Sequence, residues 1–74
     1  MLGTLIKDYL KEHGISQKWL SDKTGIPLWK ITSSLNNKRE LLTTEYCLIC
    51  SVLEVPFNYF IPASLYIEQS NKAI

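Results

Sequence analysis

Apolar residues recur along the chain with the spacing of amphipathic helices. The first stripe follows the pattern i, i+3, i+4, i+7, i+8 and predicts a helix formed around Leu2, Leu5, Ile6, Tyr9 and Leu10. Gly14 is expected to end this helix, because glycine readily adopts the left-handed backbone of a helix end. Ser16 can then cap a second helix over residues 17–23 with its side-chain oxygen.

Glycine, proline and asparagine divide the middle of the chain. Thr24-Gly25 breaks the second helix, and Ile26-Pro27 opens a third, since proline suits the first helical position. Three apolar residues are expected to share one face of this third helix, namely Leu28, Ile31 and Leu35. Asn36-Asn37 supplies the stop, because asparagine tolerates the left-handed conformation better than most residues.

Two further helices are predicted in the C-terminal half. After a polar loop over residues 38–43, Thr44 is expected to cap a fourth helix that ends near Leu53, with Glu45 in its first turn. Val55-Pro56 restarts the chain into a short fifth helix that holds Phe57, Tyr59 and Phe60. The sequence therefore predicts an all-α fold of five helices.

The periodicity is lost after Pro62. Residues 65–67 could form a strand or another helical turn, and residues 69–74 are expected to be frayed. We therefore divide the chain into a domain over residues 1–61 and a C-terminal extension over residues 62–74.

The net charge of +1 hides an uneven distribution. Residues 17–39 carry five cations and one anion, a net of +4, whereas the rest carries three cations and six anions, a net of −3. Such a basic segment suits a nucleic-acid face, because neutralising phosphates releases counterions. An ordinary solvated surface explains the same distribution, so charge alone leaves both interpretations open.

Size and composition exclude several classes of protein. A chain of 74 residues forms one small domain. No apolar run approaches the ~18 residues that a membrane helix needs, so we expect a soluble, cytoplasmic protein. No nucleophile, base or phosphate-binding loop comes together in the sequence, so we expect neither an enzyme nor a cofactor.

Cys47 and Cys50 form a Cys-x-x-Cys pair. A redox pair opens a helix that follows a strand, whereas this pair sits inside a predicted helix without a basic neighbour. His13 is the only histidine and lies far away in sequence, so no metal site is expected. We interpret both cysteines as buried packing residues.

Residues 17–37 have the features of two crossed helices joined by a tight turn. Ser21 is the small residue four positions before Gly25, and Leu20, Ile26 and Ile31 supply apolar contacts. This pattern resembles the helix-turn-helix of the Cro and phage-repressor (XRE-like) family. The resemblance covers residues 2–61 and includes Ile15-Ser16-Gln17 and the stretch 53–60.

The resemblance implies a compact, five-helix, lambda-repressor-like domain that inserts its third helix in the major groove of double-stranded DNA. It also implies a sequence-specific transcriptional regulator, a repressor of phage or bacterial type, associated with the nucleoid when bound. In the family, the glutamine opening helix two contacts phosphate, early residues of helix three reach base edges, and polar residues at its end meet the backbone. The candidate DNA-binding residues are Gln17, Lys18, Leu28, Trp29, Lys30, Thr32, Ser33, Asn36, Asn37, Lys38 and Arg39.

The chain departs from the family where bases would be read. Family members usually carry Gln, Arg, Ser or Thr at the positions of Leu28 and Trp29. An apolar pair can touch a thymine methyl but cannot make a bidentate hydrogen bond. Trp29 is either a base- or sugar-contacting wedge or a partly buried residue that covers its own domain, and Trp19 is interpreted as a core or scaffold residue without a DNA role. An exposed Leu28/Trp29 face would also suit a protein-interaction module, such as an antirepressor or antitoxin-like regulator.

Two departures concern packing. Ser34 occupies a place that is usually large and apolar, so Leu35 is expected to take over that packing. Glu54 replaces the glycine expected after the fourth helix.

The C-terminal extension suggests a homodimer. A single helix-turn-helix covers only one half-site of a palindrome, and residues 60–67 are too apolar for a free tail. The candidate dimer contacts are Leu48, Ile61, Leu65, Tyr66 and Ile67. The alternative is that Leu65 and Ile67 fold back on their own domain.

Overall fold

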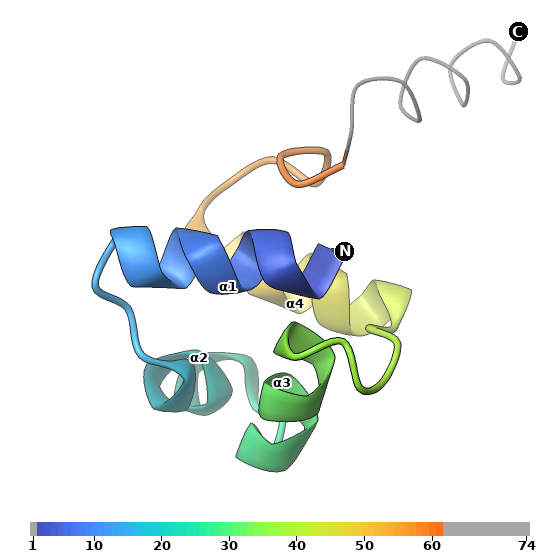
Figure 1. Ribbon diagram of the computed structural model, residues 1–74. Helices are drawn as coiled ribbons and strands as arrows, with labels where there is room; N and C mark the ends of the chain where they lie inside the picture. Colours follow the sequence, from blue (N-terminus) through green and yellow to red (C-terminus); the bar gives the residue numbers. More distant parts are fainter. Residues whose placement is uncertain (1, 62–74) are drawn as a thin grey trace, which may run out of the picture.

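Four helices make up the part of the chain that a computed structural model describes, residues 2–61 (Figure 1). The helices are α1 (Leu2–Glu12), α2 (Gln17–Thr24), α3 (Leu28–Leu35) and α4 (Thr43–Leu53). α1 packs against α3, and α2 packs against both α3 and α4. The described residues form no strand, so the expected all-helical class is confirmed for them.

Every helix contributes to one apolar core. Its buried residues are Ile6, Leu10, Leu20, Ile26, Ile31, Leu35, Tyr46, Ile49, Cys50 and Phe60. Leu35 is buried next to the small Ser34, as expected. Leu5, predicted on the apolar stripe of the first helix, is instead exposed. Leu28, predicted both on the apolar face of the third helix and among the DNA-binding residues, is exposed as well.

Local side-chain chemistry sets most helix ends as predicted. Gly14 ends the first helical segment with a φ of 66°, and Asn37 follows α3 with a φ of 61°. The Ser16 hydroxyl accepts a hydrogen bond of 3.0 Å from the backbone N–H of Trp19, which caps α2. After α4, Glu54 adopts a φ of 59°, at the position where a glycine was expected.

Two helix starts differ from the prediction. Pro27 precedes α3 with an extended ψ of 141°, so Leu28 and not Pro27 is the first helical residue. α4 begins at Thr43 and is not capped by Thr44. The carboxylate of Glu45 instead reaches back one turn and accepts a hydrogen bond of 3.0 Å from the N–H of Leu42.

The predicted fifth helix is not confirmed, because residues 57–60 form turns. The N–H of Tyr59 donates to the carbonyl of Pro56 at 2.9 Å, and that of Ile61 donates to Asn58 at 3.2 Å. Aromatic contacts account for this path. Phe60 packs edge-on against Tyr9 and is buried, while the Tyr46 hydroxyl donates to the carbonyl of Phe57. The described part of the chain thus contains four helices.

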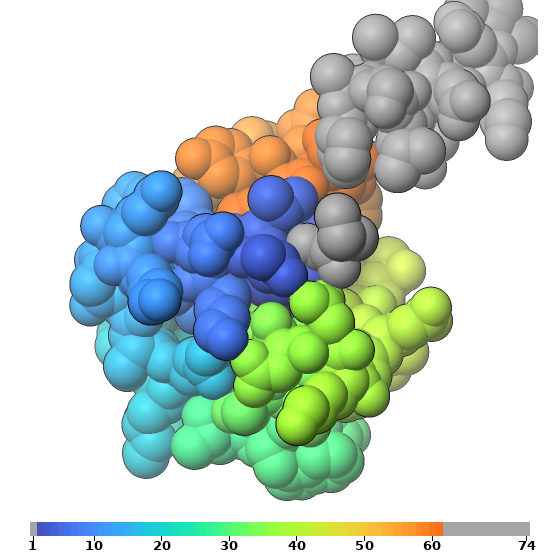
Figure 2. All heavy atoms as spheres, viewed as in Figure 1, coloured from blue at the N-terminus to red at the C-terminus, as the bar shows by residue number. Residues whose placement is uncertain are grey.

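The tightest contact between elements joins α1 to the end of α3. Gly3 lies against the backbone of α3, and a Cβ atom at this position would lie 2.1 Å from the carbonyl oxygen of Ser34. Figure 2 shows the atoms that follow α3, in green, pressed against the first turns of α1, in dark blue. Only glycine allows this approach, and it fixes the end of α3 beneath α1.

Candidate nucleic-acid interface

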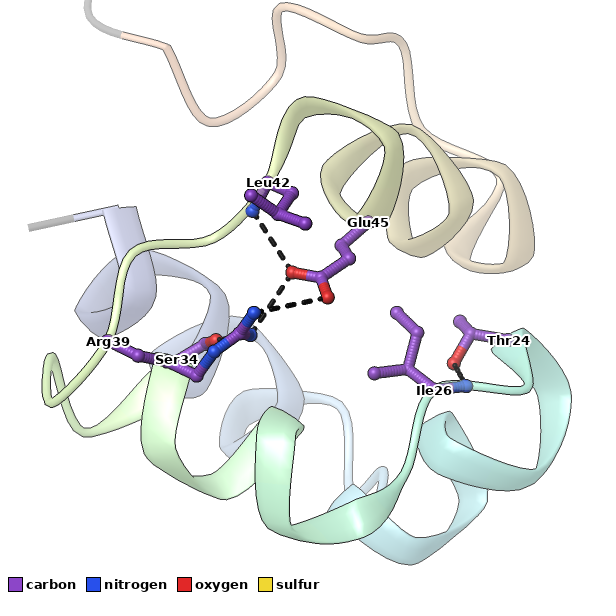
Figure 3. Close-up of polar contacts among 6 residues, drawn as sticks. All are labelled: Thr24, Ile26, Ser34, Arg39, Leu42 and Glu45. Atoms are coloured by element: carbon purple, nitrogen blue, oxygen red, sulfur yellow. Dashed lines mark hydrogen bonds and ion pairs between the residues drawn. The ribbon is translucent and has the colours of Figure 1, made fainter.

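A turn of three residues joins α2 to α3, and side chains of α2 hold it. Gly25 has a φ of 79° and donates its N–H to the carbonyl of Ser21 at 2.9 Å. The Ser21 hydroxyl donates to the carbonyl of Ile26 at 2.6 Å. The Thr24 hydroxyl accepts from the N–H of Ile26 at 3.2 Å, as Figure 3 shows. With Ile26 itself buried, these contacts fix α3 relative to α2.

One face of α3 is turned away from the core. At about 100° per residue, the buried residues Ile31, Ser34 and Leu35 occupy one side of the helix. The opposite side carries four candidate residues, of which only Ser33 is half-buried and the rest are exposed: Trp29, Thr32, Ser33 and Asn36. We call the surface formed by these four residues the α3 outer face. Leu28 lies at its edge, on the same side of the helix as Leu35 but in the first turn, where its side chain remains exposed.

The first turn of the α3 outer face is apolar. Trp29 is 64% exposed and Leu28 is 40% exposed, so Trp29 is not a partly buried residue of its own domain. The Lys30 ammonium lies 5.6 Å from the centroid of the Trp29 ring, close enough for a cation–π interaction. A cation therefore accompanies the exposed tryptophan.

The start of α2 lies beside the α3 outer face. The Thr32 hydroxyl donates a hydrogen bond of 3.1 Å to the side-chain carbonyl of Gln17, and both are candidate residues. Lys18 follows on α2 and forms an exposed ion pair with Asp22 at 3.3 Å. Exposed pairs of this kind contribute about 0.2–1 kcal/mol, so Lys18 can exchange Asp22 for another anion at small cost.

Trp19 does not belong to the core, which was one of the two structural roles that the sequence suggested for it. It is 39% exposed, and the Lys23 ammonium lies 5.9 Å from the centroid of its ring. Leu20 supplies the fully buried side chain of α2 instead. Since consecutive helical residues point about 100° apart, burying Leu20 turns Trp19 toward the surface.

Polar side chains surround the end of α3. The Lys7 ammonium on α1 donates to the side-chain carbonyl of Asn36 at 2.7 Å, and the Asn37 amide donates to the Thr4 hydroxyl at 2.8 Å. The structure thus adds Lys7, which the sequence analysis missed, to the cations near the α3 outer face. Its position one helical turn after Gly3, on the side of α1 that meets α3, is the signal that could have indicated it.

Arg39 lies within an internal polar cluster, although an exposed cation was expected. Its guanidinium donates to the Ser34 hydroxyl at 2.8 Å and to the two carboxylate oxygens of Glu45 at 3.1 and 3.3 Å (Figure 3). The side chains of Arg39 and Glu45 are only 24% and 10% exposed. This cluster, Arg39–Ser34–Glu45, fastens the loop after α3 to both α3 and α4.

The Arg39–Ser34–Glu45 cluster shifts the acid–base behaviour of Glu45. Burial alone would raise the pKa of this carboxyl, but the N–H of Leu42 and the Arg39 guanidinium bind its charged form, and the net effect lowers the pKa. The charged form is therefore the one that the folded protein stabilises.

We expect this part of the stability to be lost in acid. A carboxyl whose folded-state pKa is depressed contributes fully above its ordinary value of 4.5 and progressively less as the pH falls through the folded-state value. Glu45→Gln should lower stability by about 1–2 kcal/mol at neutral pH and flatten the decline below pH 4.5. Urea unfolding at several pH values measures both effects. Glu40→Gln, an exposed glutamate of the same loop, is the control, and an unchanged acid profile in Glu45→Gln would contradict the assignment.

The two cysteines lie in different environments. Cys50 is buried, as expected, and burial raises the pKa of its thiol, which therefore stays protonated at neutral pH. Cys47 is exposed, so its interpretation as a buried residue is wrong. Tyr46, Ile49 and Cys50 follow an i, i+3, i+4 pattern that defines the buried face of α4 and leaves Cys47 outside it.

The candidate dimer contacts divide into three groups. Leu48 is exposed on α4, whereas Ile61 is half-buried and packs against the core of its own domain. Leu65, Tyr66 and Ile67 lie outside the described residues. Beside Ile61, a groove of about 490 Å³ runs between α1 and the last turns; its lining includes Leu5, Asp8 and Tyr59.

The chain finds no match among protein-family models, curated proteins or solved structures. Among residues 2–61, no three His, Cys, Asp or Glu side chains come together to hold a metal ion. Within the same residues, every helix is too short or too polar to cross a bilayer.

Proposed function

We propose that the protein is a sequence-specific DNA-binding transcriptional regulator in which α2, the turn and α3 form a helix-turn-helix. In this proposal α3 is the recognition helix and lies in the major groove, while the start of α2 approaches the phosphate backbone. The observation that carries the proposal is the α3 outer face. Apart from the half-buried Ser33 it is exposed, and it lies beside the Gln17 end of α2, while the other side of α3 packs into the core.

The charge around this face supports DNA as the ligand. Lys18, Lys30 and Lys38 come from α2, from α3 and from the loop that follows, and Lys7 approaches from α1. α3 itself carries no acidic residue. Phosphates beside the major groove would meet cations from these four segments, which orients the helix but does not by itself select a sequence.

A salt series on the full chain tests the proposal. The affinity for mixed-sequence duplex DNA, measured by fluorescence anisotropy, should fall linearly on a plot of log K against log salt, because bound phosphates release counterions. With about four phosphate contacts, we expect a slope of roughly −3 to −4. Affinity that is absent at low salt, or that does not change with salt, would refute DNA binding through this face.

A protein-interaction module is the second candidate function. Leu28 and Trp29 favour it, because exposed tryptophans often anchor protein interfaces. Binding to such a partner would rest on apolar burial and would change little with salt, so the same salt series separates the two functions.

The proposal further includes that the protein is a repressor of phage or bacterial type. It would act in the cytoplasm as a homodimer and associate with the nucleoid when bound to DNA. Two copies related by a twofold axis would read half-sites about 34 Å apart. Leu48 is the described candidate contact that remains exposed. Sedimentation of the full chain at ~100 µM, well above a micromolar dissociation constant, checks the dimer, and a monomer there would refute it.

A further inference from the structure

The first turn of α3 presents apolar groups where a recognition helix reads bases. Residues at the start of such a helix reach the base edges, and here they are Leu28 and Trp29. Both are exposed, and both belong to the first turn of α3, with Trp29 on the α3 outer face and Leu28 at its edge. Leu28 has no polar side-chain atom, and Trp29 offers only the indole N–H donor.

The major groove contains one apolar group that such side chains can contact. Each base pair displays hydrogen-bond donors and acceptors there, and only thymine adds a methyl group. Facing a G·C pair, Leu28 would cover the guanine acceptors and the cytosine donor without replacing their bonds to water, which is unfavourable. Facing thymine, the same side chain would bury the methyl instead.

The residues one turn further do not replace this apolar contact. The Thr32 hydroxyl already donates to Gln17 at 3.1 Å, and Ser33 is half-buried. The Lys30 ammonium beside Trp29 supplies a charge that complements a phosphate next to the base pair. An apolar surface with a cation beside it therefore suits a DNA groove.

From these observations we propose that Leu28 and Trp29 read pyrimidine 5-methyl groups, so that the protein selects DNA with thymine at the base steps facing the first turn of α3. This inference rests on the proposed DNA-binding function and adds its substrate class. The recognition is of the methyl group, which thymine and 5-methylcytosine share. The sites selected should be rich in A·T pairs at these steps.

Replacing thymine by uracil tests the inference, because it removes the methyl and keeps the hydrogen-bonding edge. Binding sites are first selected from a random duplex pool with the wild-type chain, and each thymine is then changed to uracil. We expect the affinity to fall about fourfold for each methyl that Leu28 or Trp29 contacts. Trp29→Ala and Leu28→Ala should bind the selected site more weakly. Each variant should also show a smaller difference in affinity between the thymine and uracil sites than wild type does.

Two further arms identify the source of the discrimination. Replacing a contacted T·A pair by 5-methylcytosine·G should retain more affinity than unmethylated C·G, since the methyl is the group that is read. Lys38→Ala is the matched control and should weaken the thymine and uracil sites equally. Circular dichroism checks that each variant is folded, which we expect because both apolar side chains are exposed.

Each other outcome overturns the inference. If uracil sites bind as tightly as thymine sites while binding stays salt-dependent, the methyl is not read but the proposed function stands. If Trp29→Ala and Leu28→Ala retain the full uracil effect, other residues read the methyl. If the wild-type chain binds no DNA at all, or binds a protein through Trp29, the proposed function fails as well.

Discussion

Replacing Gly3 with alanine is expected to destabilise the protein by about 2 kcal/mol. In an ordinary helix the same change stabilises by about 1 kcal/mol, because alanine has the higher helix propensity. Here the added Cβ would lie 2.1 Å from the carbonyl oxygen of Ser34 and 3.1 Å from the Cα of Leu35. Both contacts involve backbone, so α1 and α3 must separate. For a domain of this size the melting temperature should fall by about 10 °C.

Chemical denaturation followed by circular dichroism measures the effect of Gly3→Ala. Asp8→Ala, on the exposed side of the same helix, is the control and should change stability by less than about 0.5 kcal/mol. A Gly3→Ala variant that is more stable than wild type would show that α1 and α3 do not approach each other this closely.

The second large effect concerns DNA affinity. Changing Lys18, Lys30 and Lys38 together to alanine should weaken binding to every DNA sequence, on the order of 100-fold at physiological salt. The plot of log K against log salt should become less steep by about three units of slope, roughly one for each phosphate that is no longer neutralised. The salt series measured on the triple variant and on wild type gives both quantities.

Arg39 is left out of this variant for a structural reason. Its removal would leave the Glu45 carboxylate buried without its partner, and a loss of stability would be mistaken for a loss of DNA binding. Lys11→Ala is the control, because it removes a lysine charge at the far end of α1, away from the α3 outer face. If the triple variant bound DNA like wild type, the proposed face would be wrong.

Features governed by neighbouring residues could be predicted from the sequence. The Ser16 cap, the left-handed Gly25 and the stop at Asn37 each depend on one side chain and the backbone beside it. The helical periods correctly placed Ile31 and Leu35 in the core. Because these elements define the α2–α3 pair, the local sequence is sufficient to locate the region that holds the candidate site.

Features that depend on partners distant in sequence could not be predicted. The role of Arg39 follows from Glu45, six residues later, and from Ser34, whose small size admits the guanidinium. The prediction that Cys47 is buried failed for a different reason. Tyr46, Ile49 and Cys50 repeat with the spacing of one helix face, and Cys47 does not fall on that face. The turns at residues 57–60 depend on aromatic contacts with α1 and α4, and local sequence carries no trace of these.

The Arg39–Ser34–Glu45 cluster also bears on the conformational entropy of binding. Lys38 precedes Arg39, whose side chain binds Glu45, and the N–H of Lys38 itself donates to the carbonyl of Ser33 at 2.8 Å. The backbone at Lys38 is therefore held before any ligand arrives. Ordering a free loop residue costs about 1–2 kcal/mol. The backbone of Lys38 is already ordered in the folded protein, so binding a phosphate would restrict only its side chain and would lose less conformational entropy.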